Sequence, residues 1–176
     1  MNLANKLTIF RVVLVPFFVL FMLTNFTEYN RLIAFLLFVI ATLTDHFDGA
    51  IARKYNMVTS FGKFMDPIAD KLLVSSALIC LTELGEVPAW AVIIIILREF
   101  AVSGVRLVAA DNGSVIAASS WGKAKTVAQM VMIIIYLLNI SALSLLAEIS
   151  MYAAVVLTVV SMIDYLVKNK SVIKFK

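Results

Sequence analysis

The sequence predicts an all-α membrane protein with six transmembrane helices and an N-terminal segment at the membrane interface. Hydrophobic residues make up 62% of its 176 residues, whereas a soluble domain is usually about half apolar. The mean hydropathy is +1.01. Six stretches are long enough to cross a bilayer, which needs about 20 helical residues. We therefore expect residues 1–176 to form a single membrane domain.

The expected helices are separated by short polar or turn-forming stretches. Gly85 and Pro88 punctuate the turn between the third and fourth helices. Pro16 is expected to kink the first helix, so that residues 3–14 lie at the interface as an amphipathic segment. No small-residue cleavage site follows the first apolar run, so we expect this run to be retained. The six expected ranges are 8–25, 31–53, 62–83, 88–109, 122–146 and 149–167.

The basic residues predict the direction of these helices. If the N-terminus is cytoplasmic and the helices alternate, 14 of the 15 Lys and Arg residues lie toward the cytoplasm and only Arg31 lies outside. This asymmetry is the positive-inside pattern of membrane proteins. The net charge of +4 is then explained by topology and by attraction to lipid headgroups. Nucleic-acid binding is disfavoured because the basic residues follow the membrane alternation.

Two residues that often bind metals are given structural roles. Cys80 lies in an apolar run, has no second cysteine and is expected to pack in the core. His46 has no second imidazole or thiol with which to form a zinc site. The sequence therefore predicts neither a disulfide nor a zinc centre.

Charges gather in the inner halves of the second, third and fourth helices. Asp45 ends the apolar part of the second helix, Asp70 lies near the start of the third, and Arg98 and Glu99 follow the apolar half of the fourth. Charge at this depth normally faces a cavity or a partner, so one polar cavity open to the cytoplasm is expected. Glu99 is expected to be a structural partner of a basic residue. The fifth and sixth helices, free of charge over 126–147 and 149–163, are expected to be ordinary spans.

Four aspartates are the strongest candidates for chemistry. Asp45 and Asp48 are three residues apart, and Asp66 and Asp70 are four apart, so each pair shares a helix face. A short turn makes the two helices antiparallel neighbours, and the pairs are expected to meet at similar depth. Four carboxylates in one cavity repel one another unless cations lie between them. All-oxygen ligation favours Mg²⁺ or Mn²⁺, and a two-metal site suits displacement at phosphorus.

The residues around the second helix's aspartates favour a phosphate ligand. Gly49 has no side chain, so a ligand can approach the backbone closely there. Arg53 is placed to pair with a phosphate group. Together these residues resemble the signature of the CDP-alcohol phosphotransferase family, D-x2-D-G-x2-A-R-x8-G-x3-D-x3-D. Every fixed position is filled, by Asp45, Asp48, Gly49, Ala52, Arg53, Gly62, Asp66 and Asp70.

The resemblance implies a metal-dependent phosphatidyltransferase with six transmembrane helices and a site facing the cytoplasm. It implies that Asp45, Asp48 and Asp66 bind metal ions, and that Asp70 binds metal and acts as the base on the acceptor hydroxyl. It also implies an integral protein of a bacterial cell membrane, and we expect a homodimer. The residues implied to bind CDP-diacylglycerol are Thr8, Arg11, Asp48, Gly49, Ala52, Arg53, Thr59 and Gly62.

Over nearly its whole length, the chain resembles the members of the family that use sn-glycerol 3-phosphate as acceptor. The stretches that carry this resemblance are 2–11, 61–74, 98–110 and 122–126. The implied products are phosphatidylglycerophosphate and CMP. The acceptor is a dianion, and four basic residues are its expected phosphate ligands: Arg98, Arg106, Lys123 and Lys125.

Other functions remain open at this point. The same chemistry could use serine, inositol or inositol phosphate as acceptor. An intramembrane prenyltransferase also binds diphosphate through aspartates, but it would need more helices and no nucleotide. A divalent-cation transporter could use the same carboxylates and would move metal across vesicles without releasing CMP.

Overall fold

A computed structural model gives the fold of the chain. It describes the backbone of residues 3–54, 60–111, 113, 116–117 and 119–170. Within these ranges it describes all side chains except those of residues 3–4, 45–54, 60–64, 66–67 and 111. The statements below concern these residues.

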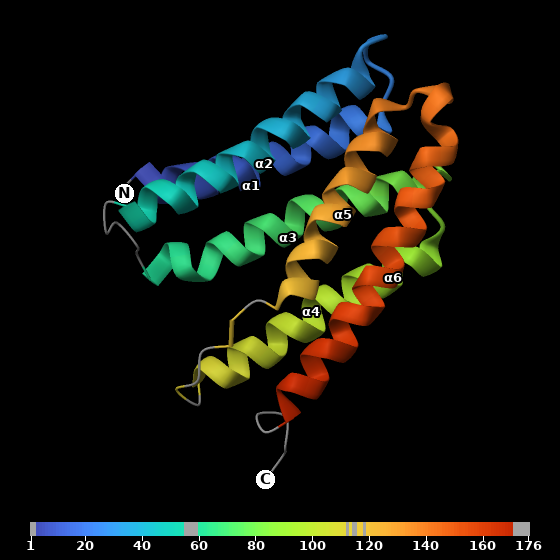
Figure 1. Cartoon of the computed structure of the whole chain (residues 1–176). Helices are drawn as coiled ribbons and strands as arrows, with labels where there is room; N and C mark the ends of the chain where they lie inside the picture. Colours follow the sequence, from blue (N-terminus) through green and yellow to red (C-terminus); the bar gives the residue numbers. More distant parts are fainter. Residues whose placement is uncertain (1–2, 55–59, 112, 114–115, 118, 171–176) are drawn as a thin grey trace. The chain divides into compact units, whose positions relative to one another are not determined.

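The described part of the chain is helical, which confirms the predicted all-α class. Its elements, coloured along the sequence in Figure 1, are α1 (Leu3–Leu23), α2 (Asn30–Lys54), α3 (Ser60–Glu83), α4 (Ala89–Asp111), α5 (Ser120–Leu138), the 3-10 helix η1 (Ser141–Leu143) and α6 (Ser144–Lys168). Among the described residues, three segments are long and apolar enough to cross a membrane: Asn5–Leu23, Ser120–Leu138 and Ser141–Lys168. The other three long helices carry the charges noted above, and six spans stay a prediction.

The largest departures from the expected boundaries are in the first, fifth and sixth helices; α6 begins at Ser144 instead of 149. Helix α1 runs without interruption from Leu3 through Pro16, so residues 3–14 do not form a separate element; proline is tolerated in helices of membrane proteins. The fifth helix ends at Leu138 instead of 146, because Asn139 takes a left-handed conformation with φ of 50°. Asparagine is one of the few residues other than glycine that adopts this conformation readily. The expected turn at Gly85 is present, with φ of 72°.

Residues Met1–Leu84 and Gly85–Lys176 form two compact units, here called the N-terminal and C-terminal units. In the N-terminal unit, α1 packs against both α2 and α3. Its core includes the rings of Phe18 and Phe38, whose centroids are 6.0 Å apart. Ala34 and Ala77 are fully buried, and such small residues let helices approach closely. Cys80 is buried and free, as expected.

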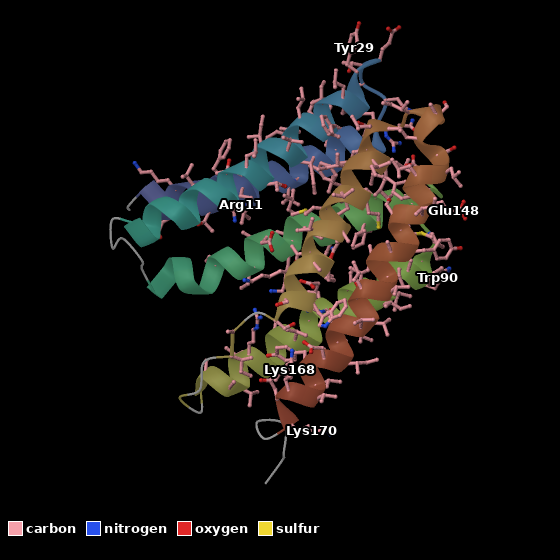
Figure 2. The ribbon with its side chains drawn as sticks, in the orientation of Figure 1. Arg11, Tyr29, Trp90, Glu148, Lys168 and Lys170 are labelled. Carbon is pink, nitrogen blue, oxygen red and sulfur yellow. The ribbon has the colours of Figure 1, made fainter. Side chains whose placement is uncertain are left out.

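In the C-terminal unit, α6 packs against α4 and α5. The core-facing positions of α6 recur at spacings of three and four residues, the period of a helix face. Charged and aromatic residues divide between the ends of this unit. Trp90 and Glu148 lie at one end, whereas Lys168 and Lys170 lie at the other (Figure 2).

Large apolar side chains cover much of the outer surface of both units. On each of the six long helices, at least one such side chain is about half exposed or more: Phe17, Leu36, Ile79, Ile93, Val127 and Val156. Extended apolar surfaces of this kind require a nonaqueous neighbour. With the long apolar helices, they identify an integral membrane protein.

Candidate active site

The inward face of α1 changes from apolar to polar along the helix. Thr8, Arg11, Val15, Phe18 and Met22 follow one another at spacings of three and four residues, and all are buried. Arg11 has no exposed surface, although arginine is rarely buried without polar or charged surroundings. It lies in the half of α1 nearer the N-terminus (Figure 2).

The inward face of α2 leads to the first aspartate pair. Ala34, Phe38 and Ala41 are fully buried and are spaced by four and three residues. Positions 45 and 48 continue this spacing and lie on the same helix, which ends at Lys54. The register therefore places both aspartate positions on the stripe along which α2 packs. The side chains of Asp45 and Asp48 lie outside the described residues.

The inward face of α3 leads in the same way to the second pair. Leu73 and Ala77 are buried, with 1% and 0% of their surface exposed. Asp70 lies three residues before Leu73, and its side chain is half-buried. Position 66 lies four residues earlier on the same helix, which begins at Ser60. The side chain of Asp66 lies outside the described residues.

The polar ends of these three stripes lie at one end of the N-terminal unit. Figure 1 shows α1 beginning, α2 ending and α3 beginning at this end. Asp48 is six residues before the end of α2, and Asp66 is six residues after the start of α3. At 1.5 Å per residue, each lies about 9 Å along its helix from the connecting segment. The backbone thus brings both aspartate positions to matched depth.

The structure describes the other predicted CDP contacts to different extents. Thr8 is buried, with 1% of its surface exposed. The backbone of Gly49, Ala52 and Arg53 belongs to the final turns of α2, and that of Gly62 belongs to the first turn of α3. The side chains of Ala52 and Arg53 lie outside the described residues, as does the whole of Thr59.

A buried ionic cluster joins two of the four predicted acceptor ligands in the C-terminal unit. Arg98 Nη1 and Lys125 Nζ both donate to Oε1 of Glu99, at 2.9 and 2.6 Å. The Arg98 Nε group donates to the hydroxyl of Ser161 at 3.1 Å. Arg98 and Lys125 are 9% and 1% exposed. Glu99 is thus the structural partner that the sequence led us to expect.

The other two predicted acceptor ligands lie outside this cluster. Lys123 is exposed. Arg106 is also exposed, and its guanidinium carbon lies 5.9 Å from the ring centroid of Tyr165. Lys123 and Lys125 differ because residues two apart on a helix point in different directions. The structure therefore gathers Arg98 and Lys125 but not Arg106 or Lys123.

The sixth helix is long and apolar enough to cross a membrane, as expected, but its inward face also carries polar side chains. Thr158 and Ser161 are fully buried on its inward face, and Ser161 accepts a hydrogen bond from Arg98. They continue a stripe that includes Met151 and Ala154 at spacings of three and four residues. Thr158 and Ser161 carry no charge, so the charge pattern of the sequence does not reveal this polar stripe.

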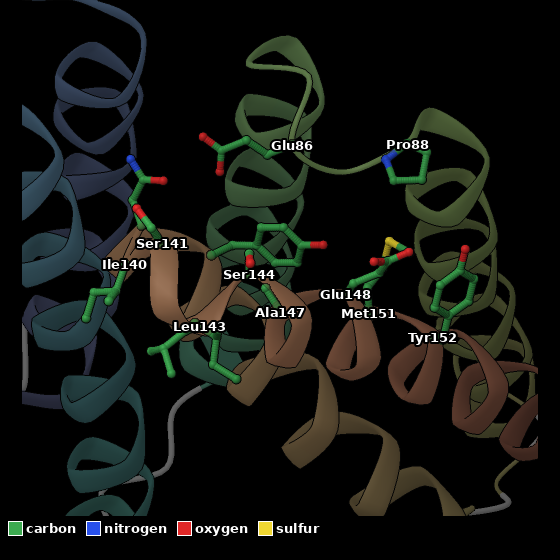
Figure 3. Close-up of a pocket in the computed structure, with 13 residues that line it drawn as sticks. Glu86, Pro88, Ile140, Ser141, Leu143, Ser144, Ala147, Glu148, Met151 and Tyr152 are labelled. Atoms are coloured by element: carbon green, nitrogen blue, oxygen red, sulfur yellow. The ribbon is translucent and has the colours of Figure 1, made fainter.

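A separate cavity of about 440 Å³ lies in the C-terminal unit near the end that carries Glu148 (Figure 3). Glu86, Tyr136, Glu148 and Tyr152 contribute to its wall. None of the predicted site residues lines it. The cavity is therefore distinct from the predicted substrate contacts.

Comparisons with known proteins identify the family of the chain. The profile of the CDP-alcohol phosphatidyltransferase family matches residues 1–160. The chain belongs to this family. It is an enzyme of the CDP-alcohol phosphatidyltransferase class, as the signature predicted. The family generally uses a divalent metal ion, and carboxylate oxygens are ligands that hard divalent cations prefer.

Three bacterial relatives carry the name CDP-diacylglycerol–glycerol-3-phosphate 3-phosphatidyltransferase. The Bacillus subtilis protein is 47% identical, over 98% of this chain and 97% of its own. The Rickettsia bellii protein is 43% identical over 93% of each chain. The Haemophilus influenzae protein is 42% identical over 94% of this chain and 91% of its own. The similarity therefore covers nearly the full length of each relative.

Proposed function

We propose that the chain transfers the phosphatidyl group of CDP-diacylglycerol to sn-glycerol 3-phosphate, giving phosphatidylglycerophosphate and CMP. One observation carries the proposal most strongly: the inward stripes of α1, α2 and α3 become polar at the same end of their unit. The residues at that end are those of the family signature. The names of the bacterial relatives support the choice of acceptor.

Asp45, Asp48, Asp66 and Asp70 are proposed to hold two Mg²⁺ or Mn²⁺ ions. When bound, such ions neutralise charge on the diphosphate and on the phosphorus under attack. Carboxylate oxygens are the ligands that these hard cations prefer. The residues proposed to hold the CDP part of the lipid are Thr8, Arg11, Asp48, Gly49, Ala52, Arg53, Thr59 and Gly62.

Asp70 is proposed to be the general base. It accepts the proton of the acceptor hydroxyl, whose oxygen then forms a bond to the β-phosphorus of CDP-diacylglycerol. The bond between that phosphorus and the bridging oxygen breaks, and CMP departs with the electron pair. Asp70 is suited to this role because its side chain is only half-buried, so a substrate can reach it.

The acceptor phosphate is proposed to bind at Arg98 and Lys125. These two cations are buried and share the Glu99 carboxylate, and neighbouring Arg and Lys side chains suit the oxygens of a dianionic phosphate. Arg106 and Lys123, which are exposed, are proposed to meet the acceptor as it approaches. An uncharged acceptor such as inositol would gain little from this arrangement.

Three further features belong to the proposal. Residues 1–176 act as one functional domain, because the family match runs from residue 1 to 160 and crosses the boundary between the units. The site faces the cytoplasm of a bacterial cell, as the basic residues predict. The protein works as a homodimer.

The deciding experiment measures CMP release from CDP-diacylglycerol by the purified protein with different acceptors. We expect release with sn-glycerol 3-phosphate, and no more than background with serine, inositol or inositol phosphate. Preferred use of another alcohol would replace the acceptor and keep the reaction class. Absence of CMP release with every acceptor would overturn the proposed reaction.

A further inference from the structure

The guanidinium of Arg98 is held from three sides in the C-terminal unit. Its Nε group donates to Ser161 Oγ at 3.1 Å, and its Nη1 group donates to Glu99 Oε1 at 2.9 Å. The third side is formed by Gly122, where an added Cβ would lie only 3.3 Å from Nη2. These neighbours come from α6, α4 and α5 respectively. Few orientations of the Arg98 side chain would make both hydrogen bonds and also fit against Gly122.

Gly122 belongs to the first turn of α5, where its N–H donates to Ser119 Oγ at 3.1 Å. The guanidinium can approach this turn because residue 122 has no side chain. A methyl group here would be tighter than ordinary van der Waals contact, and the guanidinium would have to shift by a few tenths of an ångström. The residue type at position 122 therefore sets where Arg98 sits.

Glu99 fixes the second cation relative to the first. Lys125 Nζ lies 2.6 Å from the same Oε1 atom that accepts from Arg98. The two cations share this one carboxylate in a largely buried place, where electrostatic interactions are stronger than in water. Glu99 thus holds Arg98 and Lys125 next to each other.

We propose that Glu99, Ser161 and Gly122 are positioning residues that orient Arg98 and Lys125 as a two-cation clamp for the acceptor's phosphate. This inference rests on the proposed function, because it takes the phosphate of sn-glycerol 3-phosphate as the anion. The three residues act through the cations and do not touch the substrate themselves. Their arrangement determines how well the enzyme binds a phosphorylated acceptor.

The first test is Gly122→Ala, with Gly104→Ala as its matched control. A Cβ at Gly104 would meet nothing within 4 Å, so both changes add one methyl group to a helix but only one displaces Arg98. Misplacement by about 1 Å can cost about 100-fold, so a shift of a few tenths should raise the KM for glycerol 3-phosphate about three- to tenfold. The KM for CDP-diacylglycerol should stay unchanged in both variants.

The second test is Ser161→Ala, with Ser150→Ala as its control. The Ser161 hydroxyl accepts a hydrogen bond from Arg98, whereas the Ser150 hydroxyl donates to the carbonyl of Ala147 on the same helix. Ser161→Ala should also raise the acceptor KM about three- to tenfold, and Ser150→Ala should not. The unfolding temperature of each variant in detergent distinguishes lost positioning from lost folding.

The outcomes separate the two proposals. A selective rise in the acceptor KM for Gly122→Ala and Ser161→Ala supports the clamp. The clamp is overturned if the wild type makes phosphatidylglycerophosphate but the acceptor KM of both variants is unchanged, or rises as much as the KM for CDP-diacylglycerol. The proposed function would then still stand. Failure of the wild type to use glycerol 3-phosphate overturns the proposed function, and the clamp with it.

Discussion

Replacing Lys125 with Met removes one cation from the buried cluster and keeps a side chain of similar length. Lys125 is 1% exposed, and its Nζ atom lies 2.6 Å from Glu99 Oε1. Hydrogen bonds that involve a charged group stabilise proteins by about 1.5–3 kcal/mol. The Glu99 side chain is 20% exposed, and this solvent access reduces the benefit. We therefore expect a Lys125–Glu99 coupling energy of about 1.5–2 kcal/mol.

A double-mutant cycle measures this coupling without attributing other losses to it. The four proteins are the wild type, Lys125→Met, Glu99→Gln and the double variant, each unfolded by denaturant in detergent micelles. Glu99→Gln should destabilise the protein by about 3–5 kcal/mol, more than Lys125→Met does, because it removes the carboxylate that both buried cations share. Lys125→Met leaves Glu99 paired with Arg98 at 2.9 Å.

The control is Lys168→Met, which removes the exposed partner of a second ion pair. Lys168 Nζ lies 2.6 Å from Asp164 Oδ1; the Lys168 side chain is 61% exposed and that of Asp164 is 15% exposed. We expect the free energy of unfolding to fall by no more than about 1 kcal/mol, because water screens the Lys168 ammonium group. A coupling energy below about 0.5 kcal/mol for Lys125 and Glu99 would refute the reasoning, since this buried pair would then be no stronger than an exposed ion pair.

Phe18→Ala should lower the free energy of unfolding by about 3 kcal/mol, because Phe18 is fully buried against Phe38; the neighbouring Phe17→Ala, with 49% of Phe17 exposed, should cost much less, and equal losses would contradict this packing. Asp70→Asn should lower kcat by about 100- to 10,000-fold while CDP-diacylglycerol still binds; near-normal turnover would exclude Asp70 as the base. In a Cys80→Ser background, Lys170→Cys should react with an impermeant maleimide in inside-out vesicles only, and labelling in right-side-out vesicles would reverse the orientation.

The sequence predicted the N-terminal unit well because its signals are local. Asp45, Asp48, Asp66 and Asp70 continue the three- and four-residue spacings of neighbouring apolar positions, so the faces follow from helix geometry alone. Arg11 was predicted as a substrate contact from resemblance. The structure shows that Arg11 is fully buried, and its role as a contact stays a prediction. The roles of all four aspartates stay predictions, and the side chains of Asp45, Asp48 and Asp66 lie outside the described residues.

The C-terminal unit was less predictable because its contacts join distant parts of the sequence. Arg98 and Ser161 are 63 residues apart, and helix periodicity cannot reveal which helices face each other. The choice between Lys123 and Lys125 depends on the rotation of α5, which its packing against α6 sets. The end of α5 at Asn139 depends on one residue in a left-handed conformation, a weak signal within an apolar stretch.

The most direct measurement on the aspartate site is the number of Mn²⁺ ions bound per chain, determined by electron paramagnetic resonance. If the aspartates of α2 and α3 hold the metal together, the wild type should bind two ions. Asp48→Asn and Asp66→Asn should each weaken this binding, although they lie on different helices. Unchanged Mn²⁺ binding in both variants would contradict a shared site.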